Sequence, residues 1–139
     1  MNKLRVLFLC TGNSARSQMA EGFLKHLAGE KFKVYSAGVN PTRVNPLAIK
    51  VMDEIGIDIS KHRSKSAMDF IGQKFDYVIT VCDNAKQTCP VFPGKYEKIH
   101  WSLKDPAEAQ GTEEEKLEIF RKTRDKIKEF ILDFLKKTT

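Results

Sequence analysis

The sequence predicts a three-layer α/β fold with a four-stranded parallel sheet. Short apolar runs typical of buried strands alternate along the chain with segments in which apolar residues recur at helical spacing. No internal repeat, low-complexity tract or linker interrupts this alternation. At 139 residues the chain has the length of one compact domain, so we expect a single domain over residues 1–139.

The first 38 residues predict one strand, helix, strand unit, the kind that builds parallel sheets. Residues 4–9 are a largely apolar run that ends in a tight loop, which is typical of a buried strand. Apolar residues recur at helical spacing over residues 19–27, and Gly29 supplies a stop. Residues 32–37 predict a second strand, closed by Gly38.

The next segment predicts a second helix and a third strand. Pro46 suits the first turn of a helix, and the apolar face that follows ends at Gly56. Residues 57–74 are mostly polar and predict a loop with a short helix near residues 67–71. Residues 77–81 predict a third buried strand.

The last third of the chain predicts a fourth strand at residues 98–101 and then a long helix. Thr112 with Glu115 three residues later resembles a capping box, in which each side chain satisfies the backbone N–H of the other residue. Apolar residues of this helix recur on one face, which we expect to be buried: Leu117, Phe120, Ile127, Ile131 and Phe134.

Composition and charge exclude several classes of protein. The net charge is +6, but the Lys and Arg residues are scattered and are not interleaved with stacking aromatics, which argues against nucleic-acid binding. No apolar run is long enough to span a membrane, and residues 6–9 lack the cleavage site of a signal peptide. We therefore expect a cytoplasmic protein with no membrane role, whose positive field attracts small anions.

The three cysteines are an odd number for a chain expected in the cytoplasm, where stable disulfides are rare. Their use is therefore catalytic, metal-binding or inert. Cys10 and Cys82 both fall just past predicted strands. Ligands of open parallel sheets bind beyond the carboxyl ends of the strands, so the two thiols are candidates for one crevice.

The loop that begins at Cys10 has the features of an oxyanion-binding site. It contains a glycine for a tight turn and leads into a helix, whose backbone N–H groups and positive end attract an anion. Arg16 follows the thiol after five residues and can hold two oxygens of a tetrahedral anion. The same positive surroundings favour the thiolate form of Cys10. The expected binding residues are Thr11, Gly12, Asn13, Ser14, Ala15, Arg16 and Ser17.

Cys10 by itself has a simpler interpretation, a small buried residue at a strand end. The stretch from Cys10 to Ser17, however, resembles the signature loop of low-molecular-weight protein tyrosine phosphatases and of the thioredoxin-coupled arsenate reductases that share their flavodoxin-like fold. The resemblance covers nearly the whole chain. It implies that Asn13 braces the loop and that the Ser17 hydroxyl helps to hold the thiolate.

Asp105, which precedes Pro106 in a polar loop, has the pattern of an ordinary turn residue. The resemblance favours another role, because the Asp-Pro pair matches the place where the family keeps its acidic residue. It implies that Asp105 lies across from the Cys10 thiolate and donates a proton to the leaving oxygen.

Cys82 and Cys89 lie seven residues apart. In a helix this spacing would separate the two Cα atoms by about 10 Å, whereas a disulfide needs them within roughly 7 Å. A bond between them would therefore require that segment to unwind. Inert core thiols and metal ligands are the alternatives, but no pair among the cysteines and histidines has the short spacing of a zinc site.

The resemblance implies that the chain is an enzyme that reduces arsenate to arsenite, with phosphate or sulfate as substrate analogues. Cys10 attacks arsenate, Cys82 then attacks Cys10, and Cys89 attacks Cys82, after which thioredoxin reduces the disulfide. No organic cofactor is needed, and we expect a monomer. Weak phosphatase activity is an expected side reaction.

One departure from the family concerns a potassium ion that some members bind through groups matching Asn13, Glu21, Ser36 and a carboxylate. The position aligned with that carboxylate is Lys65, whose ammonium would repel the ion and could stand in for it, so we expect no metal. Two other functions remain open: a phosphotyrosine phosphatase that uses the same loop, and a non-enzymatic oxyanion or nucleic-acid binding module with structural thiols.

Overall fold

The computed structural model describes residues 3–82 and 91–138, which form an α/β fold around one parallel sheet. Its four strands lie in the order β2-β1-β3-β4, and every neighbouring pair is parallel. The predicted fold class is confirmed. The strands are β1 (Leu4–Cys10), β2 (Phe32–Gly38), β3 (Tyr77–Thr80) and β4 (Glu97–His100).

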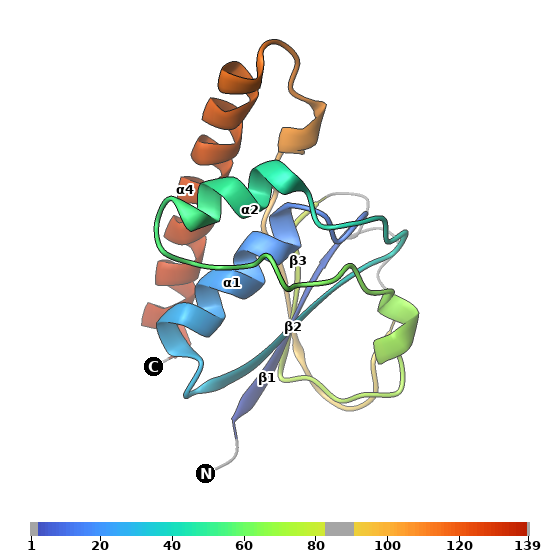
Figure 1. Cartoon of the computed structure of the whole chain (residues 1–139). Helices are drawn as coiled ribbons and strands as arrows, with labels where there is room; N and C mark the ends of the chain where they lie inside the picture. The colour runs from blue at the N-terminus through green and yellow to red at the C-terminus, as the bar shows by residue number, and fades with distance from the viewer. Residues whose placement is uncertain (1–2, 83–90, 139) are drawn as a thin grey trace.

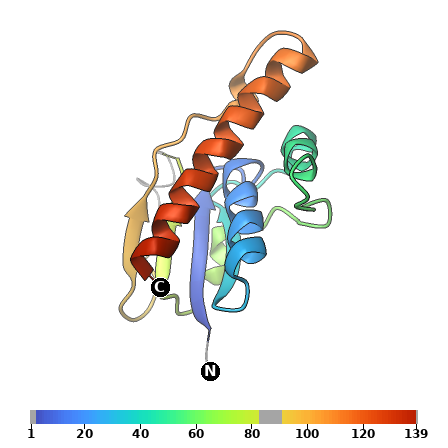
Figure 2. The ribbon, with the colours of Figure 1, turned by 90° about the vertical axis from the view of Figure 1, so that its left-hand side faces the viewer.

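The helices lie mainly on one side of this sheet. In Figure 1, α1 (Arg16–Ala28), α2 (Pro46–Asp53) and the long α4 (Glu113–Thr138) lie to the left of the strands, and the 3-10 helix η1 (Ala67–Phe70) lies to the right. Figure 2 looks onto the first side, where α4 and α1 pass in front of the sheet. The second 3-10 helix, η2 (Pro106–Glu108), precedes α4. No helix in the described part of the chain is long and apolar enough to cross a membrane.

The predicted boundaries differ from the observed ones by one or two residues. The fourth strand was expected over residues 98–101, but it ends at His100, and the Trp101 side chain packs against Phe8 and Phe130 instead. α2 ends before the predicted stop at Gly56, whose φ of 79° completes the turn. Strand ends and helix ends depend on the tertiary contacts of the next residues, which local patterns do not specify.

α4 packs on the sheet through the apolar stripe that its sequence predicts, and all five residues of that stripe are buried. The ring of Phe134 contacts Phe32 of β2 at 5.5 Å and Tyr77 of β3 at 5.0 Å between ring centroids. The capping box is also confirmed, because Thr112 and Glu115 each accept a hydrogen bond from the backbone N–H of the other. Local sequence thus determines both the start and the buried face of α4.

One buried residue of α4 was not anticipated from the sequence. Arg124 lies within the apolar stripe with only 9% of its surface exposed. Its Nη1 donates to the carbonyl of Val51 at 2.8 Å and to Glu54 at 2.9 Å, both at the end of α2. Cations are favourable at the carboxyl end of a helix, so Arg124 attaches α2 to α4.

The strand order places the candidate site. The chain runs from β1 outward to β2, and then crosses β1 to continue at β3. The carboxyl ends of β1 and β3 therefore lie side by side where the strand order reverses, which is the usual ligand site of such sheets. Cys10 ends β1 and Cys82 follows β3 by two residues.

Candidate active site

The loop after β1 folds tightly around the sulfur of Cys10. Asn13 has a positive φ of 49°, a left-handed conformation that Asn tolerates better than most residues. This turn directs the Asn13 backbone N–H at the Cys10 sulfur, 3.1 Å away. The Ser17 hydroxyl, in the first turn of α1, lies 2.9 Å from the same sulfur. A sulfur placed beside two such groups is well suited to carry a negative charge.

The side chain of Asn13 connects this loop to two other parts of the chain. Its amide nitrogen donates to Ser17 Oγ at 2.8 Å and to Ser36 Oγ, on β2, at 2.9 Å. Its amide oxygen accepts from the backbone N–H of Lys65 at 2.8 Å. The backbone carbonyl of Asn13 accepts from the Ser64 hydroxyl at 2.7 Å. The loop around Cys10 is therefore held from β2 and from residues 64–65 together.

Gln18 and His62 add a further support that the sequence did not indicate. The Gln18 amide nitrogen donates to the carbonyls of Asn13 and Arg63, and its oxygen lies 2.9 Å from His62 Nδ1. Burial lowers the pKa of His62, while the nearby Glu21 carboxylate opposes that shift. A neutral His62 with its proton on Nδ1 satisfies the Gln18 oxygen, so this pair fixes which way the Gln18 amide points.

A cavity of about 270 Å³ opens over the loop, and Arg16 and Asp105 form an ion pair among the residues that line it. Arg16 Nη1 donates to the carbonyl of Leu103 at 2.9 Å, and its Nη2 lies 3.7 Å from Asp105 Oδ2. The other carboxylate oxygen of Asp105 accepts from the N–H of Ala107 and caps η2. Asp105 is therefore both a turn residue and part of the cavity wall. The lining residues are Cys10, Thr11, Gly12, Ser14, Ala15, Arg16, Asn40, Thr42, Asp105 and Ala107.

The second cysteine lies beside the loop. Cys82 is buried, and its sulfur lies 3.3 Å from the Thr11 hydroxyl. Since Thr11 lines the cavity, Cys82 adjoins the cavity wall. The two strand-end cysteines thus come to the same edge of the sheet. Cys89 and the remainder of the expected relay segment, residues 83–90, lie outside the described residues.

Three cavity residues were missed in the sequence analysis, Ala107 and two residues that follow β2. Asn40 and Thr42 come from the chain that leaves β2, and this segment follows the loop closely. The N–H of Asn40 donates to the carbonyl of Thr11 at 2.8 Å, and that of Thr42 donates to the carbonyl of Gly12 at 3.0 Å. The sequence could have indicated these two residues, because every segment that follows a parallel strand begins at the ligand-binding edge of the sheet.

Gly38 is required by this close approach. A Cβ atom at Gly38 would lie 2.6 Å from the carbonyl oxygen of Thr11 and 2.8 Å from the backbone nitrogen of Asn13. Both contacts are with backbone atoms of the loop, which cannot rotate away as a side chain can. The end of β2 and the loop after β1 therefore touch through a position that accepts only glycine.

A buried carboxylate lies beneath the loop. Glu21, on α1, pairs with Lys25 through Oε2 and accepts a hydrogen bond from Ser36 at Oε1. Lys65 Nζ lies 3.9 Å from the same Oε1 atom. Burial lowers the pKa of Lys65, and the Glu21 carboxylate opposes that shift. Within residues 3–82 and 91–138, no group of three His, Cys, Asp or Glu side chains is arranged to hold a metal ion.

The geometry defines a class of protein, one that uses a thiol in a tight loop at the start of a helix to act on a small oxyanion. The sequence matches the family described as low molecular weight phosphotyrosine protein phosphatase over residues 5–139. The chain belongs to this family.

Its relatives include proteins named for arsenate reduction. The chain is 50% identical over 134 residues, 96% of each protein, to an arsenate reductase of Halalkalibacterium halodurans. It is similar to a solved arsenate reductase in its phosphate-binding state, with 37% identity, a TM-score of 0.79 and coverage of 98% and 99%. It also resembles a thioredoxin-dependent arsenate reductase of Corynebacterium glutamicum, with 31% identity and a TM-score of 0.71, over 98% of this chain and 64% of the other.

Proposed function

We propose that this chain is a cytoplasmic arsenate reductase that acts as a monomer of one domain and is regenerated by thioredoxin. The observation that supports it best is the cavity that Cys10 lines together with Arg16 and Asp105. In it, the Asn13 N–H and the Ser17 hydroxyl lie beside the Cys10 sulfur. Such a cavity suits a small tetrahedral anion. The names of the relatives favour arsenate over other oxyanions.

The first chemical step forms a bond between sulfur and arsenic. The Cys10 thiolate attacks the arsenic atom of arsenate, while Arg16 and the amides of the loop hold the other oxygens. One oxygen leaves, and Asp105 gives it a proton so that it departs as water. The product is an adduct in which arsenic(V) is bonded to the Cys10 sulfur, and no electrons have yet been transferred.

The second step transfers two electrons. The Cys82 thiolate attacks the Cys10 sulfur, the bond from sulfur to arsenic breaks, and its electron pair stays on arsenic, which leaves as arsenite. The two thiols are now joined in a disulfide. Cys89 attacks Cys82 and releases Cys10, and thioredoxin then reduces the bond between Cys82 and Cys89 by thiol exchange. This route needs no organic cofactor, metal ion or nucleic acid.

The reductant and the nucleophile are tested in one assay. Arsenate-dependent oxidation of NADPH is followed with thioredoxin and thioredoxin reductase, and separately with glutathione and glutaredoxin. We expect turnover only with the first system, and none for Cys10→Ser, since a serine hydroxyl stays protonated at neutral pH. Turnover by Cys10→Ser would reject the thiolate mechanism, and turnover with the second system alone would reject thioredoxin.

The relay is tested with Cys89→Ser in a single turnover. If Cys89 acts only after arsenite has left, this variant releases about one arsenite per enzyme and then stops, with Cys10 and Cys82 joined. Peptide mapping identifies the joined sulfurs. Normal cycling of this variant with thioredoxin would mean that the relay uses two thiols.

A phosphotyrosine phosphatase is the second candidate, and the cavity argues against it. An aromatic phosphate ester needs apolar walls for its ring, whereas no aromatic side chain is among the residues that line the cavity in the described part of the chain. We therefore expect only weak hydrolysis of p-nitrophenyl phosphate, at a small fraction of the arsenate turnover.

A further inference from the structure

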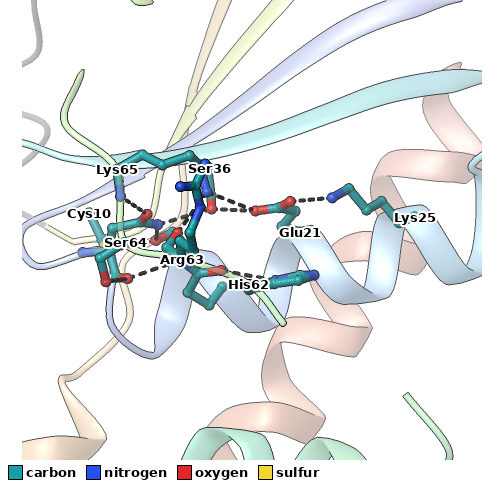
Figure 3. Close-up of polar contacts among 11 residues, drawn as sticks. Cys10, Glu21, Lys25, Ser36, His62, Arg63, Ser64 and Lys65 are labelled. Atoms are coloured by element: carbon teal, nitrogen blue, oxygen red, sulfur yellow. Dashed lines mark hydrogen bonds and ion pairs between the residues drawn. The ribbon is translucent and has the colours of Figure 1, made fainter. Parts of the chain in front are cut away.

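The buried carboxylate beneath the loop has no part in the steps proposed above. Only 5% of the Glu21 side chain is exposed, and a carboxylate is buried at a cost unless it is paired and hydrogen-bonded. In Figure 3 its oxygens lie between Ser36 on one side and Lys25 on the other. Lys65 approaches from the adjoining loop, 3.9 Å from the oxygen that Ser36 contacts.

The hydrogen bonds between this carboxylate and Cys10 have only one consistent direction. An ionised carboxylate can only accept, so the hydroxyl of Ser36 must donate to Glu21. Ser36 Oγ is then available as an acceptor, and it receives one of the two hydrogens on the Asn13 amide nitrogen. The direction of the first bond thus determines that of the second.

The backbone of Lys65 fixes the same direction from the other side. Its N–H donates to the Asn13 amide oxygen, so the Asn13 amide nitrogen must face Ser36 and Ser17. Ser17 Oγ accepts the second amide hydrogen of Asn13. A Cys10 thiolate can only accept, so the single hydroxyl hydrogen of Ser17 is then directed at its sulfur, 2.9 Å away. A donor aimed at the sulfur stabilises its thiolate form over its thiol form.

We propose that Glu21 and Lys65 are a pair of positioning residues for the Cys10 thiolate. Glu21 orients Ser36, the Lys65 ammonium helps to neutralise Glu21, and the Lys65 backbone orients Asn13, so that the Ser17 hydroxyl donates to the sulfur. The inference rests on the proposed function only in taking Cys10 as the nucleophile. By this inference Lys65 is a functional residue, although Lys65 lies outside the cavity.

The test measures the thiolate directly, without arsenate or thioredoxin. The rate at which iodoacetamide alkylates Cys10 in the full chain is followed by peptide mass spectrometry between pH 4 and pH 9. We expect Glu21→Gln to raise the midpoint of this profile by about one pH unit, from the usual strength of a hydrogen bond to a charged group. By charge alone, removing an anion and leaving two ammonium groups would lower the midpoint, so the sign separates positioning from simple electrostatics.

A double-mutant cycle identifies the route. Ser17→Ala removes the hydroxyl through which Glu21 is proposed to act on the Cys10 sulfur. Glu21→Gln should therefore cause no further shift of the midpoint in a Ser17→Ala background. Additive shifts, an unchanged midpoint or a lower midpoint in Glu21→Gln would each overturn the proposal. Failure of arsenate reduction with these shifts present would instead reject the proposed function alone.

Lys65 provides a second variant that is safer for folding, because its side chain is a quarter exposed and lies on a loop. We expect Lys65→Met to raise the midpoint by about half a unit, Lys65→Arg to restore it, and the Lys65→Met shift to vanish with Ser17→Ala. The matched control is Glu54→Gln, which removes a carboxylate that also pairs with two cations, Arg121 and Arg124. It should leave the Cys10 profile unchanged.

Discussion

The Arg16 guanidinium and the Asp105 carboxylate form an ion pair in the wall of the cavity, with 3.7 Å between Nη2 and Oδ2. Each residue is anchored through another atom, Arg16 by the carbonyl of Leu103 and Asp105 by the N–H of Ala107. An oxyanion that reaches the Cys10 sulfur therefore meets a cation and a carboxyl group that are each held by a hydrogen bond to the backbone. The two residues lead to separate predictions, because Arg16 is proposed to bind the oxyanion and Asp105 to donate a proton.

Arg16→Lys should lower kcat/KM for arsenate by about 100-fold, although the charge is kept. An ammonium cannot reproduce the planar contact of a guanidinium with two oxygens, and the lost interaction is of the order of 2 to 3 kcal/mol. Steady-state kinetics with thioredoxin measure the effect, and an unchanged urea unfolding midpoint shows that the fold is intact. Near-normal kcat/KM would remove Arg16 from the binding site.

Asp105→Asn should slow the first chemical step by about 100-fold or more, with little change in KM, because an amide cannot donate the proton that the leaving oxygen requires. Its side-chain oxygen can still accept from Ala107, so the η2 cap is kept. Rapid-quench measurement of arsenite release in a single turnover follows this step. Equal single-turnover rates in the variant and the parent would mean that another group, or water, supplies the proton.

Gly38→Ala should lower kcat/KM at least 10-fold, because the added Cβ collides with the backbone of Thr11 and Asn13 and displaces the loop. Gly72→Ala is the matched control, since a Cβ there meets no atom within 4 Å. We expect the control to keep full activity. Kinetics and urea unfolding of both variants provide the comparison, and full activity in Gly38→Ala would show that the loop position is not critical.

Glu54 gives the stability of the protein a dependence on acidic pH. The hydrogen bonds from Arg121, and then from Arg124, lower the pKa of Glu54 from 4.5 to about 2. Because the folded state has the lower pKa, this contribution to the free energy of unfolding is present above pH 4.5 and is lost as the pH falls toward 2.

Glu54→Gln tests this dependence. At pH 7 the variant should be less stable than the parent by about 1 kcal/mol, the scale of a partly exposed ion pair. The difference should shrink as the pH falls from 4.5 toward 2. Urea unfolding at a series of pH values measures it, and a difference that is independent of pH would contradict the assigned cause.

Residues that lie close in the chain determined most of the elements. The apolar run before Cys10, the helical spacing after Arg16 and the capping box at Thr112 each depend on neighbouring residues, whose geometry the backbone specifies directly. For the same reason the sequence alone predicted the parallel sheet and a loop with its thiol at the start of a helix. Local patterns identified Asp105 only as a turn residue, and in the structure it caps η2. The family resemblance was needed to make it a candidate proton donor.

Only the tertiary structure decided which distant residues meet. Arg124 lies in an apolar stripe because the end of α2, more than 70 residues earlier, presents the Val51 carbonyl to it. Lys65 orients Asn13 across 52 residues, and Gly38 is needed because the loop passes directly over it. Such contacts depend on the paths that loops take between packed elements, and no local periodicity encodes those paths. The sequence by itself therefore determined the elements and the reactive loop, whereas the packing of loops against one another decided what holds that loop in place.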